Sequence, residues 1–108
     1  MGLLVSTLRQ GYLRNYRWQL ETKLQAINDS RLELTSTITD MANTGSALSP
    51  DSPTYKVLMA RKEKLAILDK KMDENIERIK MQIKMIDAEL DLIKGKMDGE
   101  IKDSVCYV

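Results

Sequence analysis

The sequence predicts an all-α protein, a long antiparallel hairpin of two helices that is coiled-coil-like and oligomeric. Three observations predict it. Apolar residues recur every three or four positions through two long segments, both prolines of the 108-residue chain lie between these segments, and the charges of the two segments are complementary when the chain folds back. We expect one domain over residues 1–108, with a helix over 3–42, a turn over 43–53, a helix over 54–104 and an apolar tail over 105–108.

The first predicted helix carries one apolar stripe, which only Arg31 interrupts. A helix turns once every 3.6 residues, so steps of three and four keep side chains on one face. The stripe consists of Leu13, Tyr16, Leu20, Leu24, Ile27, Leu34, Ile38 and Met41.

The predicted turn combines Gly45, Pro50, Ser52 and Pro53 with small polar residues. Asn43 or Gly45 can end the first helix in a left-handed conformation. Ser52 can cap the second helix, and Pro53 suits its first position, where a missing N–H loses no hydrogen bond.

The second predicted helix has a longer stripe whose mean step is about 3.6 residues, the period of a straight α-helix. Its members are Leu65, Leu68, Met72, Ile76, Ile79, Ile83, Ile86, Leu90, Ile93, Met97 and Ile101.

Charge supports the antiparallel arrangement. Residues 1–20 carry +3 and residues 85–103 carry −3, while residues 21–42 carry −2 and residues 56–71 carry +4. A hairpin brings each segment beside one of opposite charge. Because exposed ion pairs each contribute under about 1 kcal/mol, we expect the charges to set register more than stability.

The second helix also has apolar residues nearly opposite its stripe, and Gly95 and Gly99 extend this face. A helix that is apolar on two opposed faces is normally covered on both. We therefore expect the chain to bind itself, or another helical protein. The predicted self-assembly residues are Met81, Met85, Ala88, Leu92, Val105, Tyr107 and Val108.

The N-terminal segment interleaves basic and aromatic residues, notably Arg9, Arg14, Arg17 and Trp18. This pattern allows contact with phosphate, a lipid surface or single-stranded nucleic acid. It also allows docking on the acidic end of the second helix, and we favour this second interpretation. Met1, Gly2 and Ser6 fit the minimal N-myristoylation pattern, so membrane contact stays open without being favoured.

Composition argues against catalysis and against cofactors. The chain has no histidine and one cysteine, and its net charge is +1. Residues two apart on a helix, as in Asp87, Glu89 and Asp91, do not converge on one metal ion. We expect no enzyme activity, no metal or other cofactor, and no nucleic-acid partner.

Neither a cleaved signal peptide nor a membrane-spanning segment is evident. The sequence leaves the location unknown, with the cytoplasm as the default unless a signal-independent system exports the chain.

The layout resembles the needle subunits of type III secretion systems, in which a P-x-x-P turn separates two helices. Here Pro50-Asp51-Ser52-Pro53 has that form, and residues 54–65 are similar in character to the start of the second helix in that family. The resemblance implies a subunit that is exported without a cleaved signal and polymerises into a hollow filament. A longer second helix, a basic N-terminal segment and the terminal Cys-Tyr-Val depart from the family pattern.

The predicted function is structural: self-assembly into an oligomer or filament. A small coiled-coil adaptor or secretion chaperone that binds another protein is the first alternative. A peripheral membrane protein is the second.

Overall fold

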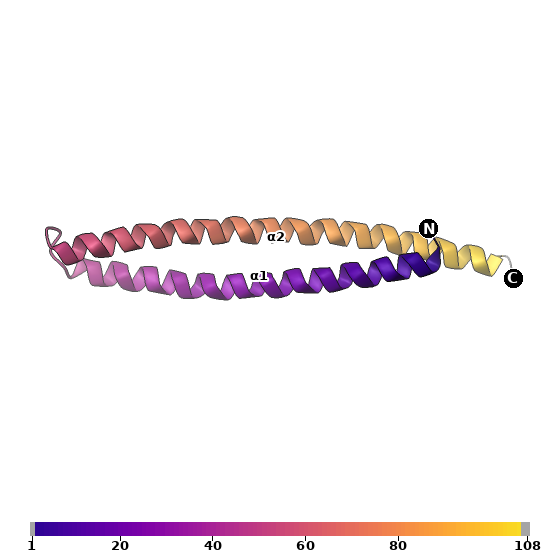
Figure 1. The fold of residues 1–108 in the computed structure, drawn as a ribbon, viewed down its shortest axis with the longest axis horizontal. Coiled ribbons are helices and arrows are strands. Elements are labelled where there is room, and N and C mark those ends of the chain that lie inside the picture. Colours follow the sequence, from indigo (N-terminus) through magenta and orange to yellow (C-terminus); the bar gives the residue numbers. More distant parts are fainter. Residues whose placement is uncertain (1, 107–108) are drawn as a thin grey trace. The chain divides into compact units, whose positions relative to one another are not determined.

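The protein is a helical hairpin (Figure 1). The structure, a computed structural model, describes the backbone of residues 2–106 and the side chains of residues 2–101. Helix α1 spans Leu3–Ser46 and helix α2 spans Pro53–Cys106. This confirms the predicted all-α, antiparallel two-helix fold.

The hairpin divides into two compact units. Unit 1 combines Met1–Lys23 with Ile79–Val108, and unit 2 consists of Leu24–Arg78. Each unit contains a segment of both helices, so each has its own seam of packed side chains.

The seam of unit 1 is aliphatic. Its buried side chains come from both helices at the predicted spacing, namely Leu13, Leu20, Ile79, Ile86 and Ile93. Burying a side chain of this size contributes roughly 1.5–3 kcal/mol, so these residues are the main source of stability here. Tyr16 and Ile101, which the sequence placed in the stripes, lie 38% and 49% exposed.

The seam of unit 2 is more polar. Leu34 and Ile76 are buried, whereas Leu68, a predicted member of the stripe, is exposed. Arg31 donates from Nε to Asp69 and from Nη1 to Asp73, both at 2.9 Å. The residue that interrupts the α1 stripe therefore links the two helices.

The predicted cap of α2 is present. The Tyr55 backbone N–H donates to Ser52 Oγ at 3.0 Å, and Pro53 is the first helical residue. The side chain of Ser52 thus satisfies a backbone donor that has no partner within the helix.

The predicted end of α1 was wrong. The helix continues past residue 42 to Ser46, and none of the described residues has a positive φ. Gly45 is instead buried inside the last helical turn, where an added Cβ would lie 2.9 Å from Met59 Cε. Its missing side chain makes room for the start of α2, and no left-handed conformation is needed.

The other end of α2 also extends further than predicted. The helix reaches Cys106, so the backbone of Val105 is helical rather than part of a separate tail. The side chain of Val105, and Tyr107 and Val108 entirely, lie outside the described residues.

Candidate self-assembly surface

The second apolar face of α2 is open to solvent in the single chain. Met81, Met85 and Leu92 are 65%, 67% and 68% exposed, and Ala88 between them is exposed as well. The opposite side of the same helix buries Ile86 and Ile93 almost completely. The second helix therefore has one covered and one uncovered apolar face.

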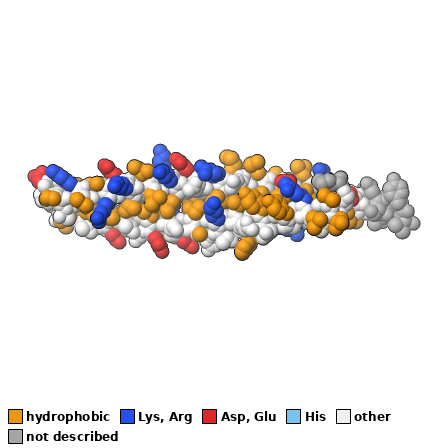
Figure 2. All heavy atoms as spheres, in the orientation of Figure 1, with side chains coloured by type: hydrophobic (Ala, Val, Ile, Leu, Met, Phe, Trp, Pro, Cys, Tyr) orange, Lys and Arg blue, Asp and Glu red, His pale blue; other side chains and the backbone are white. Residues whose placement is uncertain are grey.

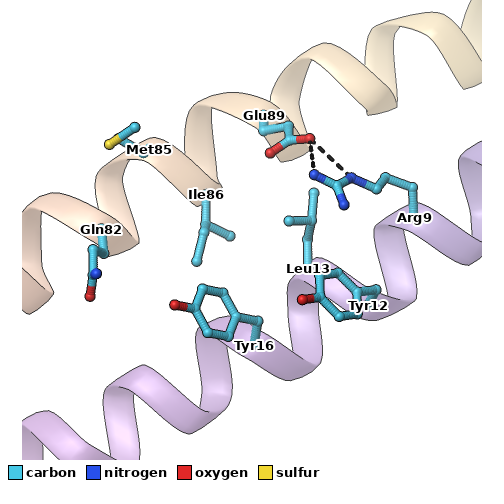
Figure 3. Close-up of a pocket in the computed structure, with 8 residues that line it drawn as sticks. All are labelled: Arg9, Tyr12, Leu13, Tyr16, Gln82, Met85, Ile86 and Glu89. Atoms are coloured by element: carbon cyan, nitrogen blue, oxygen red, sulfur yellow. Dashed lines mark hydrogen bonds and ion pairs between the residues drawn. The ribbon is translucent and has the colours of Figure 1, made fainter.

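A groove of about 410 Å³ lies between the helices of unit 1 (Figure 3). Leu13 and Ile86 point into the space between the helices, Tyr12 and Tyr16 lie along α1, and Met85 lies along α2. The groove is shallow and mostly apolar, with Gln82 and the Arg9–Glu89 pair supplying its polar groups.

The two tyrosine rings form an ordered wall of this groove. Their centroids are 6.4 Å apart and their planes differ by 9°, a stacked arrangement. The Arg9 guanidinium carbon lies 5.6 Å from the Tyr12 ring centroid, within reach of a cation–π interaction.

Arg9 also pairs with the acidic end of α2. Its Nε and Nη2 donate to Glu89 Oε1 at 3.0 and 2.8 Å. The same guanidinium therefore contacts Tyr12 and neutralises a carboxylate, which leaves no net charge at this end of the groove.

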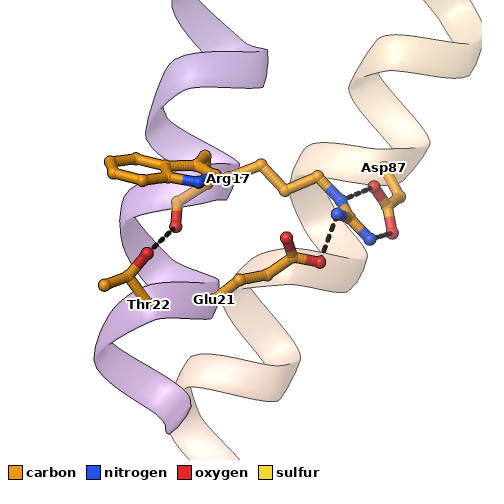
Figure 4. A network of polar contacts seen from close by, with 5 residues as sticks. Arg17, Glu21, Thr22 and Asp87 are labelled. Atoms are coloured by element: carbon orange, nitrogen blue, oxygen red, sulfur yellow. Dashed lines mark hydrogen bonds and ion pairs between the residues drawn. The ribbon is translucent and has the colours of Figure 1, made fainter. Parts of the chain in front are cut away.

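Arg17 makes the equivalent link on another side of the seam (Figure 4). It donates from Nε to Asp87 Oδ1 at 2.6 Å and also contacts Glu21 on its own helix. The hydrogen bond to Asp87 is the largest cause of a raised Arg17 pKa.

These pairs bear on the basic N-terminal segment. Two of its three arginines, Arg9 and Arg17, are engaged by α2 carboxylates, as expected for docking on the acidic end of α2. Arg14 and Trp18 are exposed, and the Thr22 hydroxyl donates to the Trp18 backbone carbonyl at 3.0 Å.

Sequence reasoning did not place Tyr12 and Tyr16 beside Met85. Tyr16 was expected in the core stripe, and Tyr12 was not assigned to either face. The signal that could have found the arrangement is the charge pattern, because pairing Arg9 with Glu89 brings Tyr12 level with residues 85–89.

Metal sites and membrane-spanning segments are two further kinds of functional feature. Among the described residues no group of three or more histidine, cysteine, aspartate or glutamate side chains is placed to hold a metal ion. No helix in the described part of the chain combines the length and apolar character needed to cross a membrane.

Comparison with protein-family models, with curated proteins and with solved structures found no match to this chain.

Proposed function

We propose that this chain is a structural subunit that assembles with copies of itself into an oligomer or filament. The observation that carries the proposal is the exposure of Met81, Met85 and Leu92, each about two-thirds open, on a helix whose other face is buried. Water contact with such large side chains is unfavourable, and a second helix laid on this face would remove it.

The resemblance of the turn to type III needle subunits suggests the form of the assembly. The Pro50–Pro53 motif joins two helices here as it does in that family, and Ser52 within the motif caps α2. A needle-like filament is therefore the assembly that we propose to look for first.

The test is the mass of the purified chain by light scattering during size exclusion. Wild-type protein should elute as species much larger than 12.4 kDa. Met85→Glu places a charge on the open face of α2 and should reduce the mass to that of the single chain, because an unpaired buried charge is strongly unfavourable.

Leu32→Glu is the matched control, since Leu32 is 71% exposed and belongs to unit 2, whereas Met85 belongs to unit 1. It should leave the assembly intact. A wild-type chain that stays at 12.4 kDa would contradict self-assembly. An assembly that Met85→Glu does not disturb would contradict the α2 face as its interface.

A further inference from the structure

The open apolar face of unit 1 is built from both helices. On α1, the exposed residues Val5, Leu8, Tyr12 and Tyr16 recur at steps of three and four, which places them on one stripe. On α2, the stripe is Met81, Met85, Ala88 and Leu92. Both stripes border the same groove, because Tyr12, Tyr16 and Met85 all line it (Figure 3).

The ion pair at the groove extends this face toward the start of α1. Leu8 precedes Arg9 by one residue, and Leu92 follows Glu89 by three. Since the helices run antiparallel and Arg9 binds Glu89, Leu8 and Leu92 lie at nearly the same height. Hydrophobic side chains are indeed visible on the surface over the part of the chain near its termini (Figure 2).

The total exposed surface of the chain is large enough to accommodate an interface. A folded monomer of 12.4 kDa typically exposes about 6,100 Å², whereas this chain exposes 8199 Å². The excess is about 2,000 Å², and a standard interface buries about 800 Å² on each partner. The chain thus has enough surplus surface for at least one such interface.

Charge favours a second copy of the chain as the occupant. Arg9 and Glu89, bound to each other, are the charged residues that line the groove, so this lining has no net charge that would repel an identical groove. For an anionic membrane or an acidic protein, the same pairing removes the attraction that Arg9 would supply.

We infer that a second copy of this chain docks on the composite face of unit 1, by which we mean the α1 and α2 stripes together. The α1 tyrosines are then buried in the interface together with the α2 methionines. This inference rests on the proposed self-assembly and adds α1 to the interface. It assigns Tyr12 and Tyr16 to the binding of another copy of this chain.

The experiment compares two exposed aromatic residues of α1. Tyr12 is 61% exposed and Trp18 is 63% exposed, and they lie about 120° apart around the helix. Sedimentation equilibrium over a range of concentrations should show that Tyr12→Lys weakens association at least about tenfold, as expected for a buried aromatic at an interface. Trp18→Lys should weaken it less than about twofold, and Tyr12→Phe should retain the wild-type affinity.

Hydroxyl-radical footprinting of the wild-type chain provides a measurement that does not depend on the folding of a variant. Tyr12, Tyr16 and Met85 should become protected as concentration rises, while Trp18 stays reactive.

The possible outcomes distinguish the composite face from the proposed self-assembly through α2 alone. Association that is lost in Met85→Glu but kept in Tyr12→Lys, with Tyr12 reactive in the assembled state, would overturn the composite face and leave the α2 face. A wild-type chain that is monomeric at every concentration would overturn both, and a different protein or a membrane would then be the occupant to test.

Discussion

Arg31 shows how one residue can break a pattern without breaking the fold. It falls within the apolar stripe of α1, yet its guanidinium reaches Asp69 and Asp73 on α2 and stays about one-third exposed. The hydrogen bond to Asp69 is the largest cause of its raised pKa. Water and two carboxylates together replace the contacts that a leucine would make, so the seam tolerates a charge.

Ser6 is the opposite case, a polar residue enclosed without compensation. It is 0% exposed, and its Oγ has no hydrogen-bond partner among the described residues. An enclosed hydroxyl that has lost water and gained no partner lowers stability by about 1–3 kcal/mol.

We therefore expect Ser6→Ala to stabilise the protein. The free energy of unfolding, measured by urea denaturation and circular dichroism, should rise by about 1 kcal/mol more than in Ser30→Ala. Ser30 is exposed on the same helix, so that variant reports the difference in helix propensity alone. Equal effects of the two substitutions would show that burial of the Ser6 hydroxyl does not lower the stability of the protein.

At the scale of the helix, the beginnings were easier to predict than the ends. Ser52 and Pro53 favour the start of a helix through their own side chains, so these two residue types alone predict where α2 begins. The end of α1 depends on Gly45 meeting Met59 across the turn, a contact that no local pattern contains. Fold class and helix number followed from periodicity, whereas the last turns depended on packing.

One part of the candidate surface could be predicted from the sequence, and the other was not. The α2 face containing Met81, Met85 and Leu92 could be predicted, because periodicity along one helix is enough to define a face. The contribution of Tyr12 and Tyr16 was not predicted, because it depends on the register between segments about eighty residues apart, which periodicity alone does not give. Periodicity along each helix does not show which residues of the two helices lie opposite each other. The charge pattern indicates this register only approximately.

The cap of α2 provides a test at this scale. Ser52→Ala removes the acceptor for the Tyr55 N–H and should lower the free energy of unfolding by about 1 kcal/mol. Ser49→Ala is the control, since Ser49 contributes its backbone carbonyl to the turn and its side chain is exposed. Thermal unfolding followed by circular dichroism would measure both variants. A loss as large in Ser49→Ala would assign the effect to the turn and not to the cap.

For the whole molecule, the balance between buried and exposed surface sets how stable one chain can be. Each helix has a single neighbour, so only one seam per unit is covered, and 8199 Å² stays in contact with water. Ion pairs add little, since Arg9, Arg17 and their partners are all at least one-third exposed. Association is the available source of further stability.

Stability should therefore depend on protein concentration. If copies associate only when folded, raising the concentration stabilises the folded state by mass action, by about 1.4 kcal/mol for each tenfold increase in a binding partner well above its Kd. The thermal midpoint of the wild-type chain should rise between about 1 and 100 μM, and that of Met85→Glu should stay constant. A wild-type midpoint independent of concentration would contradict coupling of folding to assembly.

The sequence separation of the contacts has a consequence for the order of folding. Gly45 meets Met59 across fourteen residues, Arg31 meets Asp69 across 38, and Arg9 meets Glu89 across 80. Each doubling of the intervening chain adds about 0.6 kcal/mol of closure entropy, so the hairpin should zip from the turn toward the termini. Unit 1 then forms last and opens first. The surface proposed for assembly would exist only once folding is complete, which would keep incompletely folded chains from binding to it.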